Sequence, residues 1–233
     1  MSLTRYFVLS TPDVTKLECQ QVVTLPRQPV HLLPMVNLEY YVKNGLFEAN
    51  LIHWCKQLCS KDKVFLDIGA HSGTYTVTLA DEAKAVYSFE PQKATYYALC
   101  GSVALSGKHN VTCLQVGLGA PEQVGKMPLK IVSADGGGSS LHSTEGVLRV
   151  EEVEIRTLDS YELEDVGFIK MDVEENELFV LMGGLNTIRK SHYPKILFES
   201  NYNNTKLFDY VRSIGYKEVI AVTGCHNMYL AVV

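Results

Sequence analysis

The chain has 233 residues, of which 46% are hydrophobic and 20% are charged, and its formal net charge is −5. This length and composition fit a single domain, residues 1–233, with a substantial core. The sequence has no run rich in Lys and Arg. The acidic balance therefore argues against nucleic acid or an anionic membrane as the main partner, because phosphate binding depends on basic charge.

Cysteine usage and the lack of a targeting signal predict a cytoplasmic protein. Six cysteines occur without a paired C-x-x-C spacing, which favours buried, reduced thiols over zinc ligands or disulfides. The sequence shows no secretory signal and no apolar segment of membrane-spanning length. It leaves the oligomeric state open, with a homodimer as one option.

An N-terminal extension, residues 1–44, precedes the main body of the domain at 45–233. The extension has mixed character and contains prolines and the adjacent Tyr40 and Tyr41. We expect it to pack on a sheet or over a bound ligand. A helix is expected next, at 47–59, from its apolar spacing.

The most informative stretch follows this helix and reads VFLDIGAHSGTY. Val64–Ile68 is short and apolar and is followed by turn residues, which is typical of a buried parallel strand. Gly69 and Gly73 allow a sharp turn and a close approach of the backbone to a ligand. Residues 74–80 are then expected to begin a helix.

A second apolar run, at 85–89, ends in Glu90. Gly69 and Glu90 are 21 positions apart (90 − 69). A nucleoside-binding α/β domain places an acid on a ribose hydroxyl at a spacing of about 20 residues. Glu90 is therefore a candidate ribose ligand, since a carboxylate offers two acceptor oxygens at the end of a strand where such sheets bind ligands.

Asp67 indicates which nucleoside derivative would fit. A nicotinamide site favours G-x-G-x-x-G with a diphosphate on the helix N-terminus, whereas here an acid stands two positions before Gly69. An acid would repel a diphosphate but would suit a ligand with an amino group and a sulfonium, such as S-adenosylmethionine. The plain alternative is that the glycines only make a turn, and a dinucleotide is a more distant one.

The middle of the chain gives a helix, a third strand and a turn, at 91–107, 110–116 and 117–119. Alternating apolar residues at 127–132 and 147–156 then predict a hairpin. The loop between these strands contains three consecutive glycines and His142. We expect a mobile loop that could cover the site.

The last third of the chain contains two strands that end in acids. The first runs from Gly167 and is followed by Asp172 and Glu174, and the second is Pro194–Glu199. Apolar residues from 178 to 188 follow a helical period. A helix at 204–214 and two strands, at 217–223 and 227–233, close the chain.

This order of motifs resembles the FkbM family of S-adenosylmethionine-dependent methyltransferases. The resemblance covers about residues 45–200, and it depends on D-I-G-A-x-x-G, F-E-P, K-x-D-V-E and I-L-F-E in that order. It implies an α/β fold, the Rossmann-like three-layer sandwich of class I methyltransferases. The seven-stranded, mostly parallel sheet would have the order 3-2-1-4-5-7-6 with the last strand antiparallel, plus an extra β-hairpin around 126–156.

Two positions depart from the family pattern. The family usually has glycine where this chain has Glu175, and it often has asparagine where this chain has His71. Glycine would relax the turn after the strand, so we expect the local geometry at Glu175 to differ. His71 would lie near the methionine part of the cofactor.

The motifs and the resemblance together define the expected cofactor site within the core at 45–233. The candidate cofactor-binding residues are Glu48, Asp67, Gly69, Ala70, His71, Gly73, Tyr75, Glu90, Pro91, Val116, Gly117 and Asp172. Glu48 could equally be a solvated helix acid, and Val116 could equally belong to the core.

Methyl transfer from a sulfonium requires mainly alignment, but a hydroxyl acceptor needs a base to take its proton. The candidate catalytic residues are Asp172, Glu174, Glu199 and His142, with Asp172 the first choice because it ends the strand beside the cofactor strand. Three close acids would raise one another's pKa or would bind a divalent metal such as Mg²⁺. Glu174 could instead cap the helix, and Glu177 is expected in its solvated first turn.

The resemblance implies O-methylation, and a sugar hydroxyl on a glycan or glycosylated metabolite is the leading acceptor. The alternatives are an N-methyltransferase, a polyketide-type small-molecule O-methyltransferase and a SAM-binding module without catalysis. Four tyrosines, Tyr40, Tyr41, Tyr75 and Tyr202, could stack on a sugar or an aromatic ring.

Overall fold

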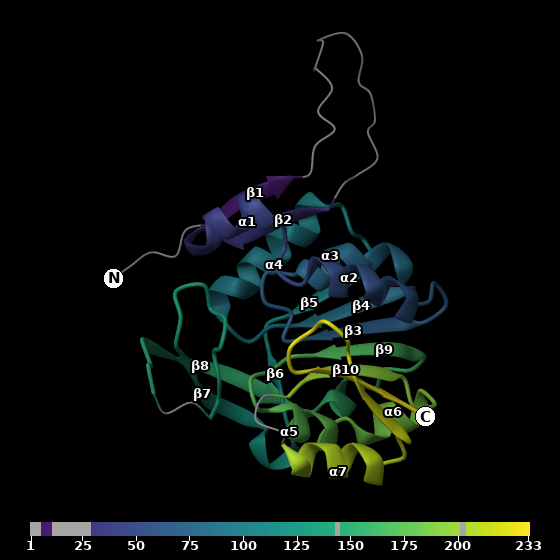
Figure 1. The fold of residues 1–233 in the computed structure, drawn as a ribbon. Helices are drawn as coiled ribbons and strands as arrows, with labels where there is room; N and C mark the ends of the chain where they lie inside the picture. The colour runs from purple at the N-terminus through teal and green to yellow at the C-terminus, as the bar shows by residue number, and fades with distance from the viewer. Residues whose placement is uncertain (1–5, 11–28, 143–144, 201–203) are drawn as a thin grey trace.

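A seven-stranded sheet forms the centre of the computed structural model, which describes residues 6–10, 29–142, 145–200 and 204–233 (Figure 1). Its strands are β3 (Val64–Ile68), β4 (Ala85–Phe89), β5 (Val111–Leu114), β9 (Val166–Met171), β10 (Lys195–Glu199), β11 (Glu218–Ala221) and β12 (Met228–Val232). They lie in the order β5-β4-β3-β9-β10-β12-β11, and only β12 runs antiparallel to its neighbours. The predicted order, 3-2-1-4-5-7-6 with the last strand antiparallel, is therefore confirmed.

Alternating residues of β3 supply two separate cores, one on each face of the sheet. Leu66 and Ile68 face the cluster that includes Leu181 and Leu207, whereas Phe65 faces the cluster that includes Leu79. Both faces are covered, so β3 is buried at every position, as the continuous apolar run predicts for a parallel strand.

Seven α-helices are present in the described residues. They are α1 (Leu38–Asn44), α2 (Ala49–Cys55), α3 (Thr74–Leu79), α4 (Lys93–Leu105), α5 (Glu177–Met182), α6 (Leu185–Lys190) and α7 (Thr205–Ser213). None of those described is long and apolar enough to cross a membrane.

The single helix suggested by the apolar period from 178 to 188 is wrong, because the chain breaks into α5 and α6 at Gly183. A Cβ atom at Gly183 would overlap the carbonyl oxygen of Gly119. The side chain of Asp159 stabilises the N-terminus of α6, since its carboxylate accepts hydrogen bonds from the backbone N–H groups of Asn186 and Thr187. An acid at a helix N-terminus satisfies otherwise unpaired donors, so the break is built by a segment remote in sequence.

The predicted hairpin around 126–156 is confirmed as β7 (Gly125–Ile131) paired antiparallel with β8 (Arg149–Arg156). A short strand, β6 (Gly117–Leu118), lies in the predicted turn at 117–119 and pairs parallel with β8. Figure 1 shows this three-stranded sheet to one side of the main sheet.

The N-terminal segment lies on a helix rather than directly on the main sheet. Strands β1 (Tyr6–Ser10) and β2 (Val30–Pro34) pair antiparallel, and β2 packs along α4. The Leu32 N–H donates to the Ser102 hydroxyl at 2.9 Å. This arrangement carries α1 toward the carboxyl ends of the central strands (Figure 1).

The break at Gly183 gives a test of the fold. We expect Gly183→Ala to lower the free energy of unfolding by about 1–3 kcal/mol, because the added methyl group meets backbone rather than a flexible side chain. Urea denaturation measures the change, and Gly137→Ala is the control, since its Cβ would have no neighbour closer than 3.5 Å. Equal stability of the two variants would contradict the close approach.

Candidate functional site

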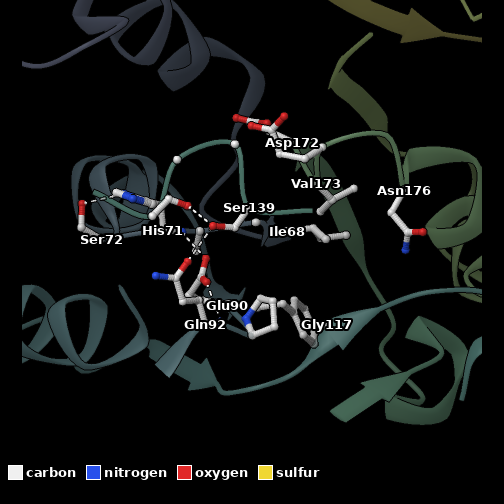
Figure 2. Close-up of a pocket in the computed structure, with 18 of the residues that line it drawn as sticks. Ile68, His71, Ser72, Glu90, Gln92, Gly117, Ser139, Asp172, Val173 and Asn176 are labelled. Carbon is white, nitrogen blue, oxygen red and sulfur yellow. Dashed lines mark hydrogen bonds between the residues drawn. The ribbon is translucent and has the colours of Figure 1, made fainter. Parts of the chain in front are cut away.

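A cavity of about 280 Å³ opens at the carboxyl ends of β3, β4 and β9, where open α/β sheets bind ligands. Figure 2 shows Glu90 and Gln92 on one side of it and Asp172 on the other. The predicted cofactor residues that line it are Glu48, Gly69, Ala70, His71, Tyr75, Glu90, Pro91, Val116, Gly117 and Asp172. Of the twelve predicted, Asp67 and Gly73 are absent from this lining.

The glycine turn brings two strands together at the cavity floor. Gly69 has a φ of +77°, and a Cβ there would overlap the carbonyl oxygen of Asp172. Glycine is therefore required both by the backbone conformation and by the close approach of β9. Gly73, with a φ of +87°, packs against Leu99 and shapes the turn without lining the cavity.

Glu90 is fixed by three donors. Its Oε1 accepts from the Gln92 N–H and the Thr95 hydroxyl, both at 2.9 Å, and its Oε2 accepts from the His71 N–H at 2.8 Å. Since each carboxylate oxygen can accept two hydrogen bonds, Oε2 keeps room for one further donor from the cavity. The free acceptor position is of the kind that a hydroxyl group requires.

His71 adopts a left-handed conformation with a φ of +50°. Asparagine and histidine are among the side chains that tolerate this region, so either residue type fits the backbone here. The His71 Nε2 lies 2.8 Å from the backbone oxygen of Asp135, so we assign its proton to Nε2. The ring therefore ties the cavity edge to the loop between β7 and β8.

Asp67 points away from the cavity. Its side chain is 0% exposed, and its Oδ2 accepts a 2.5 Å hydrogen bond from the Thr76 hydroxyl of α3. The structure does not support the direct contact with a cationic ligand that the sequence predicts. Asp67 instead joins the end of β3 to the first turns of α3.

Lys170 belongs to the K-x-D-V-E motif but has no role predicted from the sequence. Its ammonium donates to the carbonyl oxygen of Gly69 at 2.9 Å and lies 3.8 Å from Asp67 and 3.6 Å from Asp172. Burial acts to lower the pKa of Lys170, but the surrounding carboxylates, Asp172 first, outweigh it and raise the pKa above its ordinary value. A lysine inside an otherwise apolar strand was the available signal.

Three predicted catalytic acids, Asp172, Glu174 and Glu199, lie together, with one oxygen of each within 4.8 Å of the others. We call them the acid cluster. Burial, and then the charge of Asp172, raise the pKa of Glu199 to about 8, so Glu199 carries a proton at neutral pH and offers it to Asp172. Burial also raises the pKa of Glu174.

Glu175 lies in the left-handed region of backbone conformation, which favours glycine. Its φ is +75°, and that of Glu174 is +52°, so two acids in succession are left-handed. The turn after β9 is therefore strained, and a difference from the family's geometry stays a prediction. The Glu174 carbonyl accepts a hydrogen bond from the Ser140 hydroxyl at 2.8 Å, which holds the turn against the loop.

The structure also departs from the sequence analysis at Glu177, which is buried rather than solvated. Its Oε1 accepts a 2.9 Å hydrogen bond from the Val173 N–H. Burial raises the pKa of Glu177 to about 8. The side chain therefore braces the turn between β9 and α5.

His142 lies outside the cavity lining. Its Nε2 lies 2.9 Å from the side-chain oxygen of Asn176, and its ring stacks on Phe179 at 5.7 Å. This placement does not support the predicted role as a base. Asn176, which the sequence analysis missed, is buried, lines the cavity (Figure 2) and donates to the Leu118 carbonyl at 2.9 Å.

The glycine-rich loop closes one side of the cavity through specific contacts. Asp135 accepts a 2.7 Å hydrogen bond from the Asn37 amide, and the Ser139 hydroxyl donates to Gln92 at 2.9 Å. Gly136 lies so close to Gln92 that a Cβ would meet the amide at 2.8 Å. The loop is anchored in this conformation, and its movement as a lid stays a prediction.

Comparison with known proteins identifies relatives of this arrangement. The profile of the methyltransferase FkbM domain matches residues 67–218. The hexuronic acid methyltransferase AglP of Haloferax volcanii is 25% identical over 147 residues, which cover 63% of this chain and 60% of that protein. The chain therefore spans three fifths of that curated relative.

Two solved structures share the fold. The crystal structure of methyltransferase FkbM from Methylobacillus flagellatus superimposes with a TM-score of 0.55 at 19% identity, covering 74% of this chain and 44% of that one. Precorrin-6y C5,15-methyltransferase from Geobacter metallireducens gives 0.51 at 13% identity, covering 81% and 89%. These likenesses support the fold and, at such identities, no finer conclusion.

The environment of Lys170 predicts a large stability effect. We expect Lys170→Met to cost about 3 kcal/mol of unfolding free energy at pH 7, because it leaves buried carboxylates without their cation. The cost should shrink as the pH falls and the acids become protonated. Lys63→Met is the control, since its pair with Asp165 is exposed and should contribute less than about 1 kcal/mol. Similar losses in urea denaturation would contradict the central role of Lys170.

Glu177 predicts a pH-dependent effect. Its pKa is about 8 in the folded chain against an ordinary 4.5, so the folded state binds more protons and loses stability as the pH rises from 4.5 to 8. Glu177→Gln keeps an acceptor for Val173 and removes this loss. We expect it to stabilise the chain by about 2 kcal/mol at pH 8 and by little at pH 5, as measured by urea denaturation. A gain independent of pH, or one shared by the exposed Glu122→Gln, would contradict this.

Proposed function

The chain belongs to the FkbM methyltransferase family, and we propose that it transfers a methyl group from S-adenosylmethionine to a hydroxyl of a sugar in a glycan or glycosylated metabolite. The observation that carries the proposal is Glu90, which ends β4 with an oxygen available to the cavity. The strand order β5-β4-β3-β9 places it between Val116, which follows β5, and Asp172, which follows β9. That order matches adenine, ribose and sulfonium along the cofactor.

The apolar end would take the adenine ring. Its lining residues include Phe89, Val116, Leu118 and Ile155, which offer apolar surface to a flat ring. The methionine part would lie against Gly69 and His71. The cationic sulfonium would then approach Glu48 and Asp172, so the acids that line the cavity supply the favourable charge that Asp67 was expected to give.

Asp172 is the proposed base. The acceptor oxygen forms a bond to the methyl carbon, the sulfur–methyl bond breaks with its electron pair left on sulfur, and the hydroxyl proton passes to the Asp172 carboxylate. Glu199, protonated at neutral pH, holds Asp172 by sharing its proton. Alignment of the three reacting atoms contributes the larger part of the acceleration, and proton removal contributes about a hundredfold or more.

The similarity to a hexuronic acid methyltransferase supports a sugar as acceptor. The tyrosines that the sequence analysis assigned to the acceptor divide into three groups. Tyr41 lines the cavity and Tyr40 packs beside it, Tyr75 is buried with its hydroxyl donating to Glu48 at 2.8 Å, and Tyr202 lies outside the described residues. The cytoplasmic location, the domain limits and the homodimer stay predictions.

Substitution of Asp172 tests the proposal. We expect Asp172→Asn to lower kcat about a hundredfold with labelled S-adenosylmethionine and a sugar panel. The dissociation constant of S-adenosylhomocysteine should change by less than about threefold. Glu152→Gln, an exposed acid on β8, is the control. Full turnover in Asp172→Asn would refute the base assignment, and failure of the unaltered chain to bind the cofactor would refute the whole proposal.

A chelator separates the base from a metal. The acid cluster offers the carboxylate oxygens that Mg²⁺ prefers, and a bound cation could acidify the acceptor hydroxyl. With Asp172 as the base, we expect turnover to persist in excess EDTA. Loss of turnover that Mg²⁺ restores would replace the base by a metal site on the same three side chains.

A further inference from the structure

Three aromatic side chains form a shelf at the cavity mouth. Phe47 stacks on Tyr40 with ring centroids 4.0 Å apart and planes at 18°, and Tyr41 meets Phe47 edge to face at 5.0 Å. Phe47 and Tyr41 line the cavity. We call Tyr40, Tyr41 and Phe47 the aromatic shelf.

The shelf remains accessible despite this packing. Phe47 is 42% exposed and Tyr40 is 40% exposed, whereas Tyr41 is buried against them. Large exposed aromatic surface beside a cavity is typical of a binding surface rather than of a core. The shelf is continuous with Glu48, the next residue along the chain, whose carboxylate is held by the Tyr75 hydroxyl.

Carboxyl groups dominate the polar lining of the cavity behind the shelf. Among its described lining residues, the carboxylates are Glu48, Glu90, Asp135, Asp172 and Glu174, and the single lysine is Lys170. The Lys170 ammonium is buried against Asp67, Asp172 and the Gly69 carbonyl, so its charge is already used. An anionic acceptor would meet carboxylates without a free cation to pair with.

We infer, on the basis of the proposed function, that the acceptor is an uncharged pyranoside whose apolar face stacks on the aromatic shelf. Sugars bearing a carboxylate, the class named for the Haloferax volcanii relative, are rejected by this chain. The C–H face of a pyranose fits the exposed surface of Phe47 and Tyr40. Its hydroxyl groups are donors that match the acidic lining. Of the lining carboxylates, Asp172, the base beside the acceptor, and its neighbour Glu174 oppose a uronate through like charge, which is the repulsive element that specificity requires.

The first experiment compares matched acceptors with the full chain. Methyl pyranosides of several neutral hexoses and the corresponding uronic acids, which differ only in a C6 carboxylate, are incubated with methyl-labelled S-adenosylmethionine. We expect kcat/KM for the neutral sugars to exceed that for their uronic acids by about tenfold or more, since like charges brought together in a binding site disfavour association. The ratio should fall at high salt.

Two results would overturn this inference without touching the proposed cofactor. They are equal or better transfer to the uronic acids, and no transfer to any pyranoside while S-adenosylhomocysteine still binds. Lack of cofactor binding is a different failure, because it would refute the proposed function itself.

A second experiment tests the shelf. We expect Phe47→Ala to raise the KM for the neutral sugar about tenfold, with kcat and the dissociation constant of S-adenosylhomocysteine changed by less than about threefold, and Phe47→Tyr to restore the KM. Tyr97→Ala, which removes an exposed ring of α4 outside the cavity lining, is the control. A KM unchanged by Phe47→Ala, or raised equally by Tyr97→Ala, would show that the acceptor does not stack there.

Discussion

The ammonium of Lys170 is the interaction on which the site depends. It joins β9 to the glycine turn after β3 by its hydrogen bond to the Gly69 carbonyl, and it lies within 4 Å of Asp67 and Asp172. Without its charge, acids at the ends of two adjacent strands would repel one another in a buried setting. The positive charge of Lys170 allows Asp67 to be fully buried below the glycine turn while Asp172 lines the cavity. Position 69 must be glycine for the two strands to come this close, because a Cβ atom there would overlap the carbonyl oxygen of Asp172.

The cavity built on this contact has polarity along its length. Along the sheet edge, Val116 follows β5 and Glu90 follows β4, whereas Asp172 follows β9 and Glu199 ends β10. The strand order therefore places Glu90 between an apolar lining residue and the carboxylates. A ligand with an apolar ring, a diol and a positive charge in that order would bind in one orientation only. Because the pKa of Glu199 is raised to about 8, the acid cluster carries less negative charge at neutral pH than three ionised carboxylates would. Shared protons of this kind let one carboxylate act as a base beside another.

Much of the architecture could be predicted because its signals are local. Each buried strand is a short apolar run. The number of residues between Gly69 and Glu90 is typical of a strand–helix–strand unit, which brings both residues to one edge of the sheet. Side-chain direction was harder. Asp67 shares the face of β3 that carries Phe65, which packs toward α3, and its capture by Thr76 and Lys170 depends on contacts remote in sequence. The helix break at Gly183 and the orientation of His142 toward Asn176 also depend on contacts between segments far apart in the sequence, which hydrophobic periodicity cannot predict.

The central claim is that the cavity holds a nucleoside by Glu90 and favours S-adenosylmethionine over a dinucleotide. Isothermal titration of the unaltered chain and of Glu90→Gln with S-adenosylhomocysteine and with NAD tests this directly. The account predicts saturable binding of S-adenosylhomocysteine, weakened about tenfold or more in Glu90→Gln because a hydrogen bond to a charged acceptor is lost, and no binding of NAD in the same range. Binding of NAD as tight as that of S-adenosylhomocysteine, or an affinity for S-adenosylhomocysteine indifferent to Glu90→Gln, would contradict it.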